Sequence, residues 1–271
     1  MNSEKRTKRQ VIEGVQSALE RYGKFGTETI SYGDKWKMPD GNYKYRKPWY
    51  GRIATGFWRT VLCTLGPVVI KISFGARVTG KQNLKCLKKQ GYISLCNHFH
   101  YLDTLFIRQA IGHVNSFHTM APWNNKAGFG GHVIRHGGMW PLSSEHAAMR
   151  NLSDEMARQL ARGKCVNFYP EHALWWNYQK PRPMKTGAFH YSVKFNVPVL
   201  PVFCTFQKTK RGGLCKLRIN ILPPVYPDAT LSRKECEQKM KQQAEKEWQD
   251  CYEQAYGQPL EYLSKQRNGV A

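Results

Sequence analysis

The sequence predicts an α/β protein in which helices flank a mixed sheet, with a membrane-associating helical segment near the N-terminus. From residue 76 onward, short apolar runs alternate with longer segments whose apolar residues recur at helical spacing, as in α/β domains. A mostly apolar segment, residues 57–74, precedes this part of the chain. The 271 residues, 41% of them hydrophobic, are enough for one sizeable core.

Residues 1–75 are predicted to form a basic, aromatic N-terminal region with amphipathic or monotopic membrane helices, and residues 76–271 a separate α/β domain that ends in a helix. Val11, Val15 and Leu19 follow a basic start at helical spacing, which predicts an amphipathic helix. Residues 23–51, rich in Gly, Asp, Lys and aromatic residues, are predicted as loop.

Residues 57–74 resemble a membrane segment in composition but not in length. Arg59 and Lys71 leave only residues 60–70 uncharged, and Pro67 interrupts that run. A spanning helix needs about 20 apolar residues. The segment is therefore predicted to lie in one leaflet, as a peripheral or monotopic anchor with Trp and basic residues at headgroup level. The alternative is a buried helix of the core.

Beyond residue 75, the elements are predicted from apolar periodicity and capping signals. The last helix should begin with the capping box Ser232-Arg233-Lys234-Glu235. Strands are predicted at residues 76–79, 92–96, 116–120, 139–142, 165–169, 198–205 and 217–222, and helices at 104–111, 145–162 and 187–195.

Charge and cysteine usage indicate the partners and the compartment. Forty-two Lys and Arg against 19 Asp and Glu give a net charge of +23, which favours nucleic acid, anionic lipid or phosphorylated substrates. The eight cysteines form no C-x-x-C pair and are interpreted as reduced thiols without a metal site. The first residues lack the apolar stretch of a secretory signal, so the active face is expected on the cytoplasmic side of a membrane.

The stretch from Ile93 to Asp103 carries the candidate chemistry. A predicted strand ends at Asn97, His98 follows, and Asp103 directly precedes the helix predicted at residues 104–111. His98 in such a turn is placed to accept a proton from a bound hydroxyl, and Asp103 to fix the imidazole tautomer. On spacing alone, an ordinary structural histidine is the stronger interpretation.

Three further stretches change that balance: Gly130-Gly131-His132-Val133-Ile134-Arg135, Phe168-Tyr169-Pro170-Glu171 and Val197-Pro198-Val199-Leu200-Pro201-Val202. Together with Asn97-His98 and Asp103, in this order, they resemble the four sequence blocks of the glycerolipid acyltransferases. That family includes the 1-acyl-glycerol-3-phosphate acyltransferases and tafazzin. The resemblance covers residues 76–225.

The resemblance implies a role for each matched residue. His98 would be the general base that deprotonates the acceptor hydroxyl, and Asp103 its orienting partner. Arg135 would contact acceptor phosphate, and Glu171 would position the acceptor or brace the basic residues. Lys185, in a segment similar to the family's F-K-x-G-A, would bind an anion before a helix N-terminus.

The basic side chains around Lys185 extend the same expectation. Lys180 and Arg182 are expected to add to this anion site. The co-substrate would be acyl-CoA or acyl carrier protein, the acceptor a lysolipid, and no other cofactor or metal is expected.

One block departs from the family pattern. Where phosphate-acceptor members continue as E-G-T-R, this chain has Glu171-His172-Ala173-Leu174, followed by Trp175-Trp176. The family's phosphate-binding arginine is missing. The missing arginine counts against 1-acyl-glycerol-3-phosphate as the acceptor, which the resemblance otherwise implies, and favours a lysophospholipid with a larger head group.

Two other functions are compatible with parts of the sequence. The charge and the aromatics interleaved with Lys and Arg between Trp36 and Arg52 are compatible with nucleic-acid binding, but no recognised binding motif is present. His98-x-His100 invites a metallohydrolase, but the other potential ligands lack recognisable spacing. Acyl transfer is preferred, and no nucleic-acid partner is expected.

Overall fold

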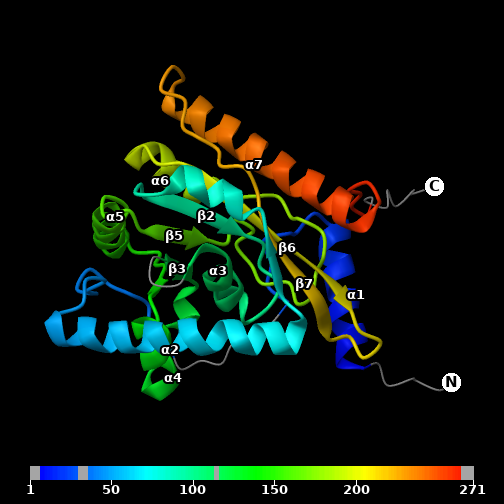
Figure 1. Ribbon diagram of the computed structural model, residues 1–271, viewed down its shortest axis with the longest axis horizontal. Coiled ribbons are helices and arrows are strands. Elements are labelled where there is room, and N and C mark those ends of the chain that lie inside the picture. The colour runs from blue at the N-terminus through cyan, green and yellow to red at the C-terminus, as the bar shows by residue number, and fades with distance from the viewer. Residues whose placement is uncertain (1–6, 30–35, 113–115, 264–271) are drawn as a thin grey trace, which may run out of the picture.

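A computed structural model describes residues 7–29, 36–112 and 116–263. One seven-stranded sheet runs through it in the order β1-β7-β6-β2-β5-β3-β4 (Figure 1). Every neighbouring pair is parallel except β6 and β7, so the sheet is mixed, as predicted. The strands are β1 (Arg77–Thr79), β2 (Tyr92–Cys96), β3 (Ser116–Met120), β4 (Met139–Pro141), β5 (Cys165–Phe168), β6 (Val199–Lys208) and β7 (Leu214–Ile221).

Helices cover both faces of the sheet. One hydrophobic cluster joins the sheet to α5, α6 and α7, and a second joins it to α2 and α3 on the other face. The α-helices are α1 (Lys8–Arg21), α2 (Trp49–Phe74), α3 (Asp103–Ile111), α4 (Gly128–His136), α5 (His146–Leu160), α6 (Gly187–Phe195) and α7 (Arg233–Tyr256). Short 3-10 helices cover Lys81–Leu87 and Pro122–Asn124.

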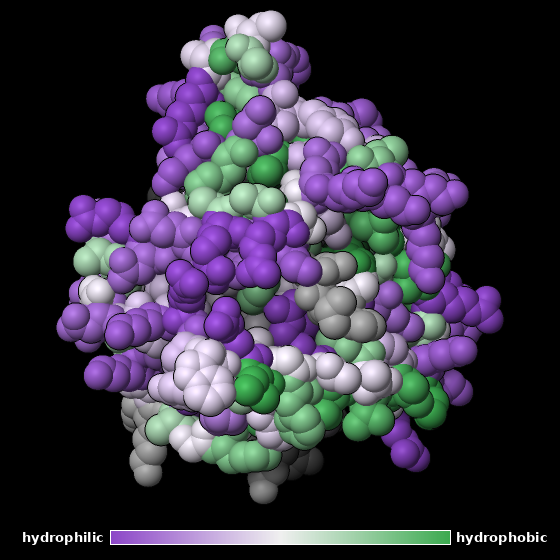
Figure 2. All heavy atoms as spheres, turned by 60° about the vertical axis from the view of Figure 1, so that its left-hand side comes forward, coloured by the Kyte–Doolittle hydropathy of each residue, from purple (hydrophilic) through white to green (hydrophobic). Residues whose placement is uncertain are grey.

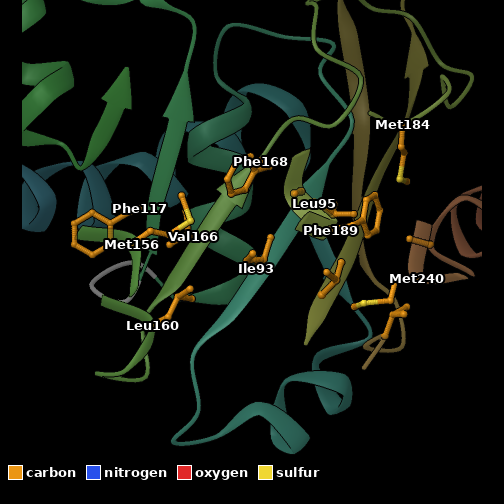
Figure 3. Close-up of a cluster of buried hydrophobic side chains, with 14 of the residues drawn as sticks. Ile93, Leu95, Phe117, Met156, Leu160, Val166, Phe168, Met184, Phe189 and Met240 are labelled. Carbon is orange, nitrogen blue, oxygen red and sulfur yellow. The ribbon is translucent and has the colours of Figure 1, made fainter. Parts of the chain in front are cut away.

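The central strand β2 shows why its residues form a buried strand. Ile93 and Leu95 point into the cluster beneath α5, α6 and α7, whereas Tyr92 and Cys96 belong to the cluster beneath α2 and α3. Side chains alternate between the faces of a strand, and both faces here are covered, so the whole run is apolar apart from Ser94. Figure 3 shows Ile93 and Leu95 among the side chains of the first cluster.

Most sequence-predicted elements are confirmed, with small shifts at their ends. The capping box of α7 is present: the Ser232 hydroxyl accepts from the Glu235 amide, and the Glu235 carboxylate accepts from the Ser232 amide. Helix α4 was not predicted, because Gly128, Gly130 and Gly131 lower its helix propensity. Tertiary contacts with α2 and β4 hold it in place.

Helix α2 differs from the expected short apolar run. It extends over 26 residues and continues through Pro67, so the expected interruption is wrong. Arg59, Cys63, Gly66 and Ile70 form its buried stripe, spaced three or four residues apart. A Cβ at Gly66 would lie 3.1 Å from Leu105 of α3, so glycine permits the close approach of these two helices.

By length and composition alone, α2 is long and apolar enough to cross a membrane. It is the only such helix in the described part of the chain. It nevertheless packs against α3 and α4, near the lower edge of the molecule in Figure 1, and 22% of its most apolar stretch is buried. The sequence-based statement that the segment is too short to span was therefore wrong on length. Its packing against the domain is that of a helix lying on the protein surface.

Helix α1 is joined to the α/β part by specific contacts. The Gln16 amide donates to the Trp176 carbonyl at 2.9 Å, and Glu20 accepts from Tyr178 and Lys180. These bonds cross the predicted boundary between residues 75 and 76. The division into two domains stays a prediction.

Candidate active site

The candidate site lies where parallel strands end. Strands β2 and β5 are neighbours, and their carboxyl ends meet at one edge of the sheet. His98 follows β2 and Glu171 follows β5. The Asn97 side chain fixes the end of β2 by bonding both the amide (2.8 Å) and the carbonyl (3.0 Å) of Cys204 in β6.

His98 and Asp103 form a short hydrogen-bonded pair, as the sequence predicted. His98 Nδ1 lies 2.7 Å from an Asp103 carboxylate oxygen, and the side chains are 24% and 2% exposed. Asp103 is the first residue of α3, so its carboxylate also accepts from the amides of Phe99 and His100, each at 3.0 Å. Burial raises the pKa of Asp103, and the contact with His98 opposes that shift.

Tyr169 packs against one face of the His98 imidazole ring. Its ring stacks on His98 with centroids 4.3 Å apart and planes 25° apart. The Tyr169 hydroxyl is buried without a hydrogen-bond partner among the described residues, and burial raises the pKa of that phenol. The stack restricts the ring of His98 to one plane.

Glu171 is directed into the protein. One carboxylate oxygen accepts from the His98 amide at 2.9 Å and from the Arg182 guanidinium at 2.6 Å, and the other accepts from the Arg182 amide. Glu171 and Arg182 are both buried. Glu171 thus braces the turn that carries His98, and these contacts leave no exposed carboxylate for an acceptor.

The basic residues named from the sequence lie in different surroundings. The Lys185 side chain is exposed just before α6, and its amide bonds the Pro170 carbonyl at 2.8 Å, which places it beside Glu171. Arg135 lies on α4 and donates to the Lys126 carbonyl and, at 3.4 Å, to the Asn125 side chain. None of the described contacts joins Arg135 to His98.

Two neighbours of Lys185 do not form the expected anion site with it. Lys180 pairs with Glu20 at 2.9 Å. Arg182 is buried and bonded internally, so its assignment to a solvent-facing anion site is wrong. Nothing in the sequence distinguishes Arg182 from the exposed basic residues around it, because its partner Glu171 lies 11 positions earlier, across a loop.

Comparison with known proteins identifies an acyltransferase domain in this part of the chain. The acyltransferase family model matches residues 75–205, the part that contains His98, Asp103 and Glu171. The crystal structure of the 1-acyl-sn-glycerophosphate (LPA) acyltransferase PlsC from Thermotoga maritima is similar in fold. Its TM-score is 0.56 at 18% identity, over 79% of this chain and 91% of that one. No protein of curated function matches the chain in sequence.

The matched residues 75–205 and the PlsC-like fold support the glycerolipid acyltransferase family for this part of the chain. The protein is an acyl-transferring enzyme with the α/β fold of PlsC.

The acyltransferase departs from its family in the segment after Glu171, and the structure shows where the departing residues lie. Leu174, in place of the family's arginine, is 1% exposed, and its carbonyl accepts from Thr29. Trp175 donates to the Thr27 carbonyl and stacks on Phe25. The residues after α1 therefore cover this segment, and Leu174 occupies an apolar core position.

The histidines of the acyltransferase do not assemble a metal site in the described ranges. No group of three His, Cys, Asp or Glu side chains is close enough there to hold an ion. His100 is buried and contacts aromatic rings, including Trp176 at 4.6 Å between centroids.

Proposed function

We propose that this enzyme moves a fatty acyl chain from a thioester donor, acyl-CoA or acyl carrier protein, to the hydroxyl of a lysophospholipid at a membrane surface. The observation that carries the proposal is the His98–Asp103 pair. It joins a partly exposed imidazole to a buried carboxylate at the carboxyl edge of the sheet. Phospholipid synthesis or remodelling would use such a reaction.

In the proposed reaction His98 acts as the general base. Asp103 occupies Nδ1, so Nε2 is the ring nitrogen available to accept the proton of the acceptor hydroxyl. The resulting oxygen nucleophile attacks the thioester carbonyl, and the tetrahedral intermediate expels the thiolate. The imidazolium returns its proton to that thiolate, and Asp103 stabilises the imidazolium meanwhile. Base catalysis of this kind contributes about 10²–10⁴ in rate.

The proposed acceptor is 1-acyl-glycerol-3-phosphate or a lysophospholipid with a larger head group. Lys185 is the first candidate for the phosphate contact, because it is exposed and lies just before the N-terminus of α6. Arg135 is the second, although its guanidinium already supports the loop at Lys126. Glu171 would influence the acceptor through the turn at His98. The buried Leu174 favours a larger head group over a bare phosphate monoester.

The proposed location is the cytoplasmic face of a membrane with anionic lipid. Figure 2 shows hydrophobic residues gathered along the lower edge of the molecule, where α2 lies in Figure 1. The exposed apolar side chains of α2 are Trp49, Tyr50, Ile53, Phe57, Leu65, Val68, Val69 and Ile72. Membrane proteins use such a face, flanked by basic residues, to enter one leaflet. We expect no nucleic-acid partner.

Thiol release from long-chain acyl-CoA and from acyl carrier protein tests the proposal against a panel of lysolipids. We expect release that depends on an acceptor, and a loss of about 10²-fold or more in His98→Ala and Asp103→Asn. Both variants should melt near the wild-type temperature. No release with either donor and any acceptor would refute the activity. If both variants were destabilised but their folded molecules still released thiol at the wild-type rate, His98 and Asp103 would stabilise the fold and take no part in catalysis.

The two phosphate candidates are separated by acceptor kinetics. Lys185→Ala should raise the acceptor KM more than it lowers kcat, because it removes binding energy from a group remote from the reacting hydroxyl. Arg135→Ala serves as the comparison, since it removes a guanidinium that has internal partners. A larger KM effect in Arg135→Ala would reverse the order of the two candidates.

A further inference from the structure

The turn that carries His98 is held from two sides by buried carboxylates. Asp103 accepts from the amides of Phe99 and His100 and contacts the imidazole. Glu171 accepts from the amide of His98 itself. Two carboxylates therefore fix three successive peptide units of this turn.

Of these two carboxylates, Glu171 forms an ion pair with the buried guanidinium of Arg182. Arg182 comes from the segment before α6, and its side chain is 1% exposed. Its Nη2 lies 2.6 Å from Glu171 and 3.2 Å from the His98 carbonyl, and it also donates to the Ala173 carbonyl. Its Nη1 donates to the Phe25 carbonyl at 3.1 Å.

The guanidinium is further fixed by the ring of Trp175, whose centroid lies 4.8 Å from the Arg182 Cζ atom. The Trp175 amide donates to the His98 carbonyl at 3.0 Å. Both polar atoms of the His98 backbone thus bond to groups that Arg182 contacts: the amide to Glu171, and the carbonyl to Trp175 and to Arg182 directly. A planar five-donor fork suits this set, whereas a single ammonium does not.

We propose that Arg182 is a positioning residue for the acyl-transfer reaction, a role that rests on the proposed function of His98. It neutralises the buried Glu171 carboxylate, and it holds the His98 carbonyl, so the peptide on each side of His98 has one orientation. The direction of Nε2 toward the acceptor follows from that orientation. Arg182 thus does not replace the arginine missing at position 174 as a phosphate ligand, because its guanidinium is buried and hydrogen-bonded inside the protein.

The energetic reason is the cost of a buried carboxylate without a cation. Removal of one partner of a buried ion pair leaves the other charge uncompensated, and the structure rearranges or the group takes up a proton. In Arg182→Met, the Glu171 carboxylate would therefore move toward water or become protonated. Either change disturbs its bond to the His98 amide. In Glu171→Gln/Arg182→Met, the uncompensated charge is absent and the amide oxygen of Gln is able to accept from His98.

The test compares Arg182→Met, Arg182→Lys, the double variant and a matched control, Arg158→Met. Arg158 pairs with Glu155 within α5, so its loss removes an arginine–glutamate pair away from the turn. We expect Arg182→Met to lower kcat by about 10²-fold with little change in the acceptor KM, since a small misplacement of a catalytic group has an effect of that size. Arg182→Lys and the double variant should recover part of the loss, and Arg158→Met should resemble wild type.

Hydrogen exchange supplies a second measurement that needs no turnover. The His98 amide should exchange faster in Arg182→Met than in wild type, and at the wild-type rate in Arg158→Met. If wild type showed no acyl transfer, the proposed function would fail, and the exchange rates would still decide whether Arg182 holds the turn. Should Arg182→Met not fold, Arg182→Lys provides the same comparison.

Two results would overturn the proposal. The first is a rise in the acceptor KM at unchanged kcat, which would make Arg182 a substrate-binding residue. The second is unchanged exchange at His98 in a folded Arg182→Met, which would show that the turn does not depend on the guanidinium.

Discussion

At the scale of single residues, His98 is constrained at Nδ1, at one ring face and at its backbone amide. Asp103 occupies Nδ1, Tyr169 lies against the ring, and Glu171 accepts from the backbone amide. Of these three partners, Asp103 is the one for which the sequence predicts a role in orienting His98. The ring of Tyr169 stacks on His98, whereas its hydroxyl has no described hydrogen-bond partner, so the two groups should affect activity differently.

Tyr169→Phe should keep activity within a few-fold of wild type, whereas Tyr169→Ala should lower kcat by roughly tenfold. The phenylalanine ring preserves the stack, which is worth about 0.5–1.5 kcal/mol. It also removes a buried hydroxyl without a described partner, so stability should stay equal or rise by up to about 1 kcal/mol. Acyl-transfer kinetics and thermal melting of both variants measure this. A severe loss in Tyr169→Phe would give the hydroxyl a direct part in the reaction.

At the scale of elements, α2 has one face buried against α3 and α4 and an opposite face that is apolar and exposed. The side chains that face water are large, and exposed apolar patches of this kind indicate an interaction surface. Helix α1 offers a natural comparison, because Val11 and Val15 are exposed apolar residues outside that face.

The triple variant Phe57→Glu/Leu65→Glu/Val68→Glu should lose at least about tenfold in affinity for anionic vesicles. Each fully buried side chain of this size contributes roughly 1.5–3 kcal/mol, and a charge at the same place adds a cost of its own. Vesicle co-sedimentation measures the effect, with melting temperature as the folding control. Val11→Glu/Val15→Glu should bind as wild type does. Equal losses in both variants would mean that the effect is one of net charge alone.

At the scale of the whole molecule, buried neutral histidines link stability to pH. Burial lowers the pKa of His100 to about 4, and its Nδ1 accepts from the Leu102 amide, which requires the neutral ring. Burial also lowers the pKa of His118 well below its ordinary value, with Arg108 and Arg59 as further causes. In the unfolded chain both rings titrate at about 6.5.

The sign of the pH dependence follows from those shifts. Between pH 6.5 and 4 the unfolded chain binds protons that the folded chain does not, so the free energy of unfolding should fall as the pH falls. For His100 alone the loss is on the order of 3 kcal/mol. His100→Asn retains an acceptor for the Leu102 amide and should flatten this slope. Urea unfolding at several pH values measures it, and identical slopes in the two proteins would contradict the assignment.

The sequence by itself determined the fold class, nearly all the strands and the pairing of His98 with Asp103. Strand and helix periodicities are local properties, and His98 and Asp103 are five residues apart within one turn, so no distant contact is needed to place them. The family blocks added the order of the site's segments. Helix α4 and the continuation of α2 through Pro67 were not predicted, because packing against neighbouring elements overrides local propensity at these positions.

Only the tertiary structure decided which charged residues face the substrate side and which support it. Glu171 and Arg182 are of charged residue types that usually lie on the surface. A single sequence does not show that these two pair in the interior. The burial of Leu174 and Trp175 likewise depends on Phe25, Thr27 and Thr29, which are about 150 positions away in the chain. Burial and charge pairing arise from contacts between distant segments, so the fold determines them and local sequence patterns do not.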